Sequence, residues 1–351
     1  MKAFLGVLVK DVPRYVSALA GGHRAYLGLC NRYETLTPSP DGAGYTCNWE
    51  WTSDLHAPKV LPFLGRWLMV RALRDHPIRR SRGTQNPAVH PQVSFLIGHR
   101  GGEREPLLRA TIESIAAQEG ARVECIVVEQ DTESRLAGRL PKWVRLVHTP
   151  PPASDTPYNR SWAFNVGAAH ARSGVLVLHD NDLLVPADYA REILSRVEQG
   201  YEVLNLKRFI FFLSERHTAQ VIAADLGTVD LPPASVMQNA EGGGSVAITR
   251  DAFDRIGGMD ELFVGWGGED NEFWERAQTC RVWPYGYLPL VHLWHPTQAE
   301  KRKSGAPGNR LFYELSTMPP EVRIARLREA KRPVEPLSQG TPVPEGFRAS
   351  G

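Results

Sequence analysis

The sequence predicts an α/β fold with a mostly parallel central sheet. From residue 93 onward, short apolar runs that suit buried strands alternate with segments whose apolar residues repeat at helical spacing. Several of the runs end in acidic residues, as VECIVVEQD and GVLVLHDND do. Because ligands of such sheets collect beyond the carboxyl ends of the strands, we expect functional residues to follow these runs.

The predicted elements follow one another along the chain. VSFLIG (93–98) is the first strand and PLLRATIESIAAQ the first helix, followed by the strands VECIVVEQD and VRLVH, the helix NRSWAFNVGAAHA and the strand GVLVLHDND. A helix over Asp188–Gln199 comes next, then LNLKRFIFFL, the glycine-rich turn EGGGSVAIT and DELFVGWGGEDNEFWERA. LPLVHLWHP, a basic polar loop and an amphipathic helix near 319–331 complete the pattern.

The pattern divides the chain into three parts. Residues 91–331 form a single main domain, residues 1–90 an N-terminal extension of unclear type, and residues 332–351 a tail that we expect to be mobile. TQNPAVHP, from Thr84 to Pro91, reads as the linker. Upstream, VLPFLGRWLMVRALRD predicts an amphipathic helix that packs on the main domain rather than on a membrane, through Leu64, Trp67, Leu68, Val70, Arg71 and Leu73.

Composition excludes several classes of protein. With 351 residues, 42% of them hydrophobic and 23% charged, the chain can bury a sizeable core. The 41 Lys and Arg against 39 Asp and Glu exclude a general polyanion-binding surface, so we expect no nucleic-acid partner. No window approaches the roughly 18–20 apolar residues of a membrane span. The four cysteines form no C-x-x-C pair and suit reduced thiols in the cytosol, although pairing of Cys30 with Cys47 stays open.

Asp180 and Asp182 directly follow the strand VLVLH. In an extended D-x-D segment both carboxylates would project to one side, which suits a divalent cation and its phosphate oxygens. The alternative is that Asp and Asn simply favour the turn after a strand.

The segment from Gly265 to Glu272 enters a predicted helix through W-G-G-E-D. Its glycines permit close approach of a ligand, Trp266 offers a flat face for a sugar ring, and Glu269 and Asp270 stand in the first turn. Acids in a first turn also occur for purely electrostatic reasons. A carboxylate at a helix N-terminus should stay ionised, as a general base must be.

Two further groups complete the set of candidates. His292 and His295 converge on one metal ion only if the backbone turns between them, since in a straight strand they would face oppositely. Arg100, Arg104 and Arg160, together with Asp131, occupy places from which guanidinium groups meet a diphosphate. Tyr158 and Asn165 stand on either side of Arg160 in the sequence, at a spacing that would let the three side chains line one pocket.

Taken in order, these segments resemble the GT-A fold glycosyltransferases, specifically the β-1,4-galactosyltransferase family with its chondroitin-polymerase-like bacterial relatives. The resemblance covers roughly residues 92–315 and rests on five colinear segments. These are VSFLIGHRGGERE, YNRSWAFNVG, LHDNDLLVP, GGGSVAITRDAFDRIGGMDE and GWGGEDNEFWERA. It implies a Rossmann-like catalytic domain that contains the mostly parallel sheet.

The resemblance also implies a role for each candidate. Asp182 and His295 would hold Mn²⁺ (or Mg²⁺), with His292 where galactosyltransferases often place a methionine ligand. Asp270 would be the catalytic base and Glu269 a contact to the acceptor or donor sugar. Substrate binding falls to Arg100, Asp131, Tyr158, Arg160, Asp180, Gly244, Trp266, Gly267 and Gly268.

The implied reaction is a metal-dependent transfer, with inversion, of a hexose or N-acetylhexosamine from a UDP-sugar to a carbohydrate or glycoconjugate acceptor, as in polysaccharide biosynthesis. The competing hypotheses are a sugar-binding pseudoenzyme, a retaining transferase of the N-acetylgalactosaminyl type, and a metal phosphohydrolase. Because the Glu241–Gly242 region replaces an aromatic residue of the family, galactose is not assumed as the donor sugar. The animal members' membrane anchor is absent, so we expect a cytoplasmic enzyme, with peripheral membrane association of the N-terminal segment left open.

Overall fold

The computed structural model describes residues 2–49, 53–83, 90–224, 232–239, 242–296 and 306–330. Glu241, most of the predicted linker, the basic polar loop after residue 296 and the tail from residue 332 lie outside the described residues. No helix in the described part of the chain has the length and apolar character to cross a bilayer. Cys30, Cys47, Cys125 and Cys280 are all free thiols.

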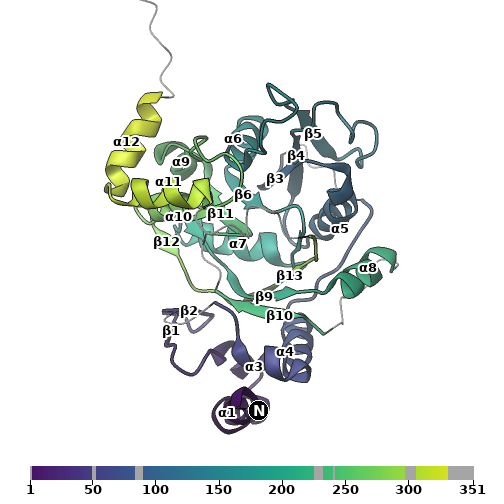
Figure 1. Ribbon diagram of the computed structural model, residues 1–351, viewed down its shortest axis with the longest axis vertical. Helices are drawn as coiled ribbons and strands as arrows, with labels where there is room; N and C mark the ends of the chain where they lie inside the picture. Colours follow the sequence, from purple (N-terminus) through teal and green to yellow (C-terminus); the bar gives the residue numbers. More distant parts are fainter. Residues whose placement is uncertain are drawn as a thin grey trace, which may run out of the picture.

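A seven-stranded sheet forms the centre of the molecule (Figure 1), with the strand order β12-β8-β11-β6-β3-β4-β5. Its strands are β3 (Val93–His99), β4 (Val123–Glu129), β5 (Val144–His148), β6 (Val175–His179), β8 (Val203–Leu204), β11 (Ser245–Thr249) and β12 (Val282–Trp283). Four of its neighbouring pairs are parallel, and only β11 runs antiparallel to its two neighbours, β6 and β8. The predicted α/β class with a mostly parallel sheet is therefore confirmed.

Side chains along the central strands alternate between two buried faces. In β3, Phe95 and Ile97 join one hydrophobic cluster, whereas Leu96 joins the other. A strand that is buried on both faces reads as a continuous apolar run, which is why VSFLIG lacks a polar alternation. The Leu96 face is covered by α6 (Arg160–His170), α9 (Arg250–Arg255) and α10 (Glu269–Ala277), and the Phe95 face by α5 (Glu105–Ala116) and α7 (Tyr189–Glu198).

Helices surround the sheet; those that begin at Glu105, Arg160, Tyr189, Glu269 and Pro320 match predicted helices, whereas those that begin at Glu215, Arg250 and Pro307 were not predicted. They are α5 (Glu105–Ala116), preceded by the 3-10 turn η2 (Gly102–Arg104), α6 (Arg160–His170), α7 (Tyr189–Glu198), α8 (Glu215–Ala223), α9 (Arg250–Arg255), α10 (Glu269–Ala277), α11 (Pro307–Ser316) and α12 (Pro320–Ala330). α11 and α12 both pack on α10, at one end of the molecule (Figure 1).

A second, four-stranded sheet lies beneath the first, with the order β10-β9-β13-β7. Its strands are β7 (Leu183–Leu184), β9 (Lys207–Phe212), β10 (Ser235–Gln238) and β13 (Leu288–His292). β13 is parallel to β9 and antiparallel to β7. The chain therefore passes from the large sheet to the small one between β6 and β7, at the aspartate pair.

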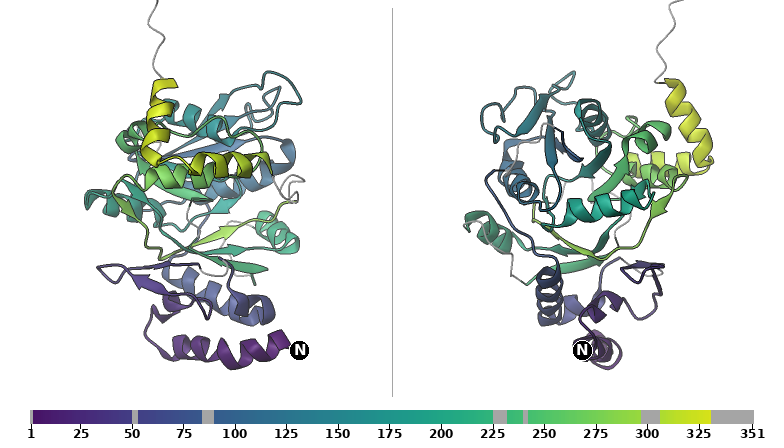
Figure 2. Two further views of the ribbon diagram at one scale, coloured as in Figure 1. Left: turned by 60° about the vertical axis from the view of Figure 1, so that its left-hand side comes forward. Right: turned by 180° about the vertical axis from the view of Figure 1, so that it is seen from behind.

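The N-terminal residues form a helical layer on the far side of the small sheet (Figure 2). Its elements are α1 (Lys2–Lys10), α2 (Val12–Ala20), the 3-10 turn η1 (Ala25–Gly28), the hairpin β1 (Leu36–Pro38) and β2 (Tyr45–Cys47), α3 (His56–Val60) and α4 (Pro62–Asp75). A fully buried arginine of β9, Arg208, donates hydrogen bonds to the carbonyls of Leu27 and Leu29 and to Asn239 Oδ1. This side chain ties the layer to the small sheet.

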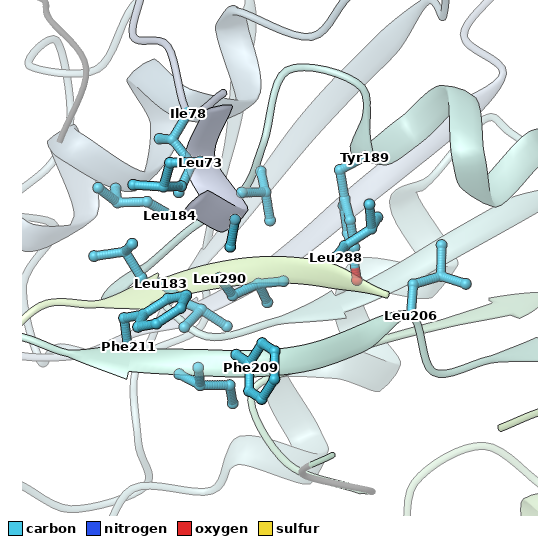
Figure 3. Close-up of a cluster of buried hydrophobic side chains, with 14 of the residues drawn as sticks. Leu73, Ile78, Leu183, Leu184, Tyr189, Leu206, Phe209, Phe211, Leu288 and Leu290 are labelled. Atoms are coloured by element: carbon cyan, nitrogen blue, oxygen red, sulfur yellow. The ribbon is translucent and has the colours of Figure 1, made fainter. Parts of the chain in front are cut away.

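The predicted amphipathic helix exists as α4 and packs on the small sheet. Leu64, Leu68 and Leu73 are buried as predicted, and Met69 is buried as well. Trp67, Val70 and Arg71 are half-buried. Figure 3 shows Leu73 from α4 in one cluster with residues of β7, β9 and β13. The prediction of a core contact for this helix is confirmed.

Replacing Arg208 by leucine should loosen the N-terminal layer. The substitution leaves the Leu27 and Leu29 carbonyls without their buried donor, so we expect a loss of roughly 3 kcal/mol in the free energy of unfolding. Urea unfolding would measure this loss, and limited proteolysis should show faster cleavage within residues 1–83. Arg216→Leu, an exposed change on α8, is the matched control. Equal stability of the two variants would contradict the assigned role of Arg208.

Candidate active site

A cleft of about 480 Å³ opens at the carboxyl ends of β3, β4 and β6. This is the edge of the sheet at which the sequence placed functional residues. The cleft brings together most of the predicted site residues, which come from segments up to about 195 positions apart in the chain. It is lined by Gly98, Arg100, Gly101, Glu103, Arg104, Asp131, Tyr158, Arg160, Asp180, Asn181, Asp182, Gly265, Trp266, Glu269, Asp270, His292 and His295.

The aspartate pair lies in a turn rather than in an extended strand. β6 ends at His179, and Asn181 and Asp182 form the turn into β7. Buried His179 fixes this turn, because its Nε2 donates to the Leu183 carbonyl at 2.8 Å while its Nδ1 contacts the Ser245 hydroxyl. The expectation that both carboxylates project to one side of a strand is therefore wrong. Asp180 and Asp182 face the same cleft with different partners.

Asp182 meets the two histidines through strand pairing. β7 pairs with β13 so that Leu183 lies opposite His292, and the Leu293 amide donates to the Asp182 carbonyl at 2.8 Å. β13 ends at His292, so the chain turns before His295 and the two imidazole rings lie 5.4 Å apart. Asp182 Oδ1 is 3.6 Å from His292 Nε2, and Asp182 Oδ2 is 3.3 Å from His295 Nε2.

These three side chains fit a divalent cation. One ligand atom from each lies within 4.8 Å of the others, which is the spacing of atoms around a single ion. Arg104 Nη2 lies 3.0 Å from His295 Nδ1, and the Pro296 carbonyl lies 2.9 Å from the same nitrogen. A proton on Nδ1 that is donated to this carbonyl leaves the Nε2 lone pair free for a metal. Two imidazoles beside one carboxylate form a donor set that divalent transition-metal ions accept.

On the opposite side of the cleft, one guanidinium contacts three carboxylates. Arg160, the first residue of α6, hydrogen-bonds Asp180 at 2.6 and 3.1 Å and contacts Asp270 through its Nη1. Glu269 lies 3.5 Å from the same Nη1. Arg160 also stacks on the Phe164 ring, with its Cζ 4.7 Å from the ring centroid. It therefore connects the β6–β7 turn to the start of α10.

Burial and this guanidinium set the protonation of the three carboxylates. Burial, helped by the neighbouring Asp270, raises the pKa of Glu269 to about 7. Burial also raises the pKa of Asp270, and the charge of Arg160 only partly offsets it. Burial alone would raise the pKa of Asp180, but Arg160 lowers it instead. The expectation that a helix N-terminus keeps both acids of α10 ionised is thus wrong for Glu269, because loss of water outweighs the helix dipole.

At two positions that border the cleft, neighbouring atoms come so close that only glycine fits. A Cβ on Gly98 would lie only 2.0 Å from the Tyr158 hydroxyl oxygen. Burial raises the pKa of that Tyr158 hydroxyl. Gly268 caps α10 in the left-handed conformation, with φ of 84°, and a Cβ there would lie 2.4 Å from the Gly308 carbonyl. The Gly265 amide donates to the Tyr158 carbonyl at 2.9 Å, which ties the tryptophan loop to the segment just before α6.

The remaining predicted residues differ in their position. Arg100 lines the cleft and donates to the Thr156 and Ser154 carbonyls, and Asp131 accepts from the Gly101 amide at 3.0 Å. Among the described residues assigned to substrate binding, Gly244, Gly267 and Gly268 do not line the cleft. The Gly244 carbonyl accepts a hydrogen bond from the Asp180 amide, so this glycine positions the aspartate turn.

Asn165 does not line the cleft, although its spacing from Arg160 predicted that it would. Its side chain bonds Met259 and the Glu261 carboxylate, which fixes the chain just before the tryptophan loop. Glu103 and Asn181 do line the cleft, although neither was assigned a role from the sequence. Only their position in the sequence could have identified them, since each follows the end of a buried strand by a few residues.

Comparison with known proteins assigns the class. The family model described as "Glycosyl transferase family 2" matches residues 102–253, and the one described as "N-terminal domain of galactosyltransferase" matches residues 235–284. Beta-1,4-galactosyltransferase 5 of Danio rerio is 25% identical over 130 residues. That match covers 36% of this chain and 28% of the relative, so the chain matches less than a third of that protein.

Two solved structures share parts of the architecture. The catalytic domain of Drosophila β-1,4-galactosyltransferase 7, in complex with xylobiose, has 20% identity and a TM-score of 0.32, covering 55% of this chain and 64% of that one. A mannosyltransferase from Pyrobaculum calidifontis, in complex with GDP-Man and Mn²⁺, has 15% identity and a TM-score of 0.40, covering 77% and 81%. Both scores are low, so these likenesses establish neither a shared substrate nor a shared metal.

Both family descriptions name glycosyltransferases, and both matches overlap the elements that build the cleft. The chain carries a glycosyltransferase domain with the GT-A fold. Within that class it resembles the galactosyltransferases, which is the resemblance that the sequence segments predicted.

Removing the Arg160 charge should raise the pKa of Glu269 above its value of about 7 in the wild type. In Arg160→Met the carboxylates of Asp180, Glu269 and Asp270 lose their shared cation, so each protonates more readily. Titration of ¹³C-labelled carboxyl groups by NMR would measure the change. Arg100→Met is the matched control, because Arg100 contacts carbonyls rather than these acids. An unchanged pKa of Glu269 in Arg160→Met would contradict the electrostatic account.

Proposed function

We propose that this chain, with residues 91–331 as its catalytic domain, is a metal-dependent inverting glycosyltransferase. It moves a hexose or N-acetylhexosamine from a UDP-sugar to a hydroxyl of a carbohydrate or glycoconjugate acceptor. The observation that carries the proposal is the composition of the cleft. A cation-compatible trio lies in the same cleft as two adjacent carboxylates of raised pKa, in a space large enough for a sugar nucleotide.

Asp270 is the proposed general base. Its carboxylate accepts the proton of the acceptor hydroxyl as that oxygen attacks the anomeric carbon, and the bond to the nucleoside diphosphate breaks on the opposite side. The carbon is inverted in this single displacement. A raised pKa makes the ionised carboxylate a stronger base than an exposed aspartate. Glu269, which lies beside it, is proposed to contact a sugar hydroxyl.

Asp182, His292 and His295 are the proposed metal ligands. When bound there, Mn²⁺ would supply positive charge that neutralises the departing diphosphate. Arg104 contacts both Asp182 and His295, so it can turn toward the phosphates once a cation replaces its contacts. Arg100, Asp131, Tyr158 and Arg160 are the proposed nucleotide-binding residues. Asp180 is proposed to bind the hydroxyls of the donor ribose or sugar.

Trp266 is proposed to stack on a sugar ring at the mouth of the cleft. It stands between Gly265 and Gly267, which have φ of 84° and 103°, values that other residues rarely adopt. With Gly268, these glycines let the loop change conformation, and a closed loop would exclude water from the donor. Gly244 serves the same site indirectly, through its bond to the Asp180 amide.

Release of nucleoside diphosphate from a panel of sugar nucleotides tests the donor and the metal. We expect turnover with a UDP-sugar, more with Mn²⁺ than with Mg²⁺, and none with EDTA. Asp182→Ala and His295→Ala should each lose roughly a hundredfold in kcat/KM, because each removes a ligand. His170→Ala, an exposed change at the end of α6, should retain activity. Full activity of the metal-stripped protein would exclude the metal, and turnover with GDP-mannose alone would exclude UDP.

Asp270→Asn should lower kcat by about 10²- to 10⁴-fold, the usual worth of a general base, while donor affinity changes little. In the wild type the ionised form is active and burial raises the pKa, so activity falls as pH drops through that pKa. The acid limb should therefore lie above the ordinary aspartate pKa of about 3.9. Asp251→Asn, an exposed change on α9, is the control. Retained transfer in Asp270→Asn, or retention of the anomeric configuration by NMR, would overturn the mechanism.

A further inference from the structure

Three polar side chains form a buried series of hydrogen bonds beneath the aspartate turn. The hydroxyl of Tyr189, at the start of α7, lies 2.9 Å from the Ser245 hydroxyl, and Ser245 Oγ lies 2.9 Å from His179 Nδ1. His179 Nε2 contacts the Leu183 carbonyl at 2.8 Å. All three side chains are at most 1% exposed, and Tyr189 lies among apolar side chains of the core (Figure 3). We call Tyr189, Ser245 and His179 the buried network.

Strand pairing explains how these side chains meet. His179, the last residue of β6, lies directly opposite Ser245, the first residue of β11, so both side chains point to the same face of the large sheet. Phe95 of the neighbouring strand β3 contacts both rings of the network, with its ring centroid 5.7 Å from that of His179 and 6.3 Å from that of Tyr189. The network therefore lies in an apolar environment, where a polar group that loses its partner costs free energy.

The direction of each hydrogen bond follows from the last one in the series. A carbonyl oxygen only accepts, so His179 carries its proton on Nε2 and donates it to Leu183. Burial lowers the pKa of His179 to about 4, so at neutral pH the ring is uncharged and Nδ1 has no proton. Nδ1 therefore accepts from the Ser245 hydroxyl, and Ser245 Oγ accepts from the Tyr189 hydroxyl. This is the one arrangement of protons that satisfies all three bonds.

The network ends at the residue that aligns the candidate metal ligands. Leu183 directly follows Asp182 and lies opposite His292 in the β7–β13 pair. β7 contributes only two residues to that pairing, so the bond from His179 is a substantial part of what holds the segment. This bond also comes from the large sheet, whereas β7 and β13 belong to the small one. The network thus fixes the Asp182 segment relative to both sheets.

We propose that Ser245 and Tyr189 are positioning residues for the candidate metal site. They orient the His179 imidazole, which holds the Leu183 carbonyl and so keeps Asp182 beside the two candidate histidine ligands. The inference rests on the proposed metal ligands and adds two residues that touch neither the metal nor the substrate. Mutating the hydrogen-bonding partners of metal ligands typically weakens metal binding by about 10- to 100-fold. Because Ser245 acts through His179 and the Leu183 backbone, we expect the lower end of that range.

Binding of Mn²⁺ to the full chain, measured by isothermal titration calorimetry, tests this role. Ser245→Ala leaves the Tyr189 hydroxyl and His179 Nδ1 without partners, so we expect roughly tenfold weaker Mn²⁺ binding. Tyr189→Phe removes only the first bond and should weaken binding less. Ser94→Ala is the matched control and should bind Mn²⁺ as the wild type does. Ser94 is equally buried and donates to Glu124 Oε1 at 2.6 Å, but it lies near the amino end of β3, away from the cleft.

Circular dichroism establishes that each variant is folded at the temperature of the titration. Wild-type affinity in folded Ser245→Ala, or an equal loss of affinity in Ser94→Ala, would overturn the positioning role. If Ser245→Ala does not fold, unchanged affinity in Tyr189→Phe overturns the role just as well. A wild type that binds no Mn²⁺ would overturn the proposed metal ligands together with this role.

Nitrogen-15 NMR of the metal-free protein tests the network separately from the metal. We expect the His179 ring of the wild type to be neutral at pH 7, with its proton on Nε2, and His179→Gln assigns the signal by difference. A proton on Nδ1 would contradict the inferred direction of the hydrogen bonds, whatever the affinity for Mn²⁺. The two measurements therefore distinguish failure of the network from failure of the proposed metal site.

Discussion

The cleft depends on one guanidinium that three carboxylates share. Arg160 begins α6, Asp180 follows β6, and Glu269 and Asp270 begin α10, so the three elements meet at this side chain. Without the cation, three acids would face one another in a partly dehydrated space, which costs free energy. The local sequence fixes the position of Arg160: Asn159 caps α6 by accepting from the Trp162 amide, and Phe164 supports the guanidinium one turn later.

The same contact explains why neighbouring acids have different protonation behaviour. Asp180 receives two hydrogen bonds from Arg160, and its pKa is lowered. Burial, helped by the neighbouring Asp270, raises the pKa of Glu269 to about 7, and Arg160 at 3.5 Å only partly offsets this rise. Two acids whose environments move their pKa values apart are the usual basis for dividing acid and base roles in a site. The geometry therefore separates a carboxylate of lowered pKa, Asp180, from one whose pKa is raised to about 7, Glu269.

Much of the fold could be predicted, because buried strands and amphipathic helices leave clear periodic signals. Most of the cleft could be predicted as well, because W-G-G-E-D leads directly into a predicted helix and D-N-D directly follows a predicted strand. The turn at the aspartate pair could not, since β7 has only two residues and gives no strand signal. The packing of the N-terminal layer on the small sheet through Arg208 could not be predicted either. An arginine inside the apolar run LNLKRFIFFL has no pattern that identifies which distant carbonyls accept its hydrogen bonds.

The missed turn also explains how the cleft combines residues that the sequence keeps far apart. β6 belongs to the large sheet and β7 to the small one, so residues 180–182 are the crossing between the two sheets. β7 is held by β13, and this pairing places His292 beside Asp182. On the other side of the crossing, Asp180 is bonded to Gly244, next to β11 of the large sheet. The candidate metal trio thus lies at the junction of the two sheets, where the β7–β13 pairing and the Leu293–Asp182 bond hold its ligands together.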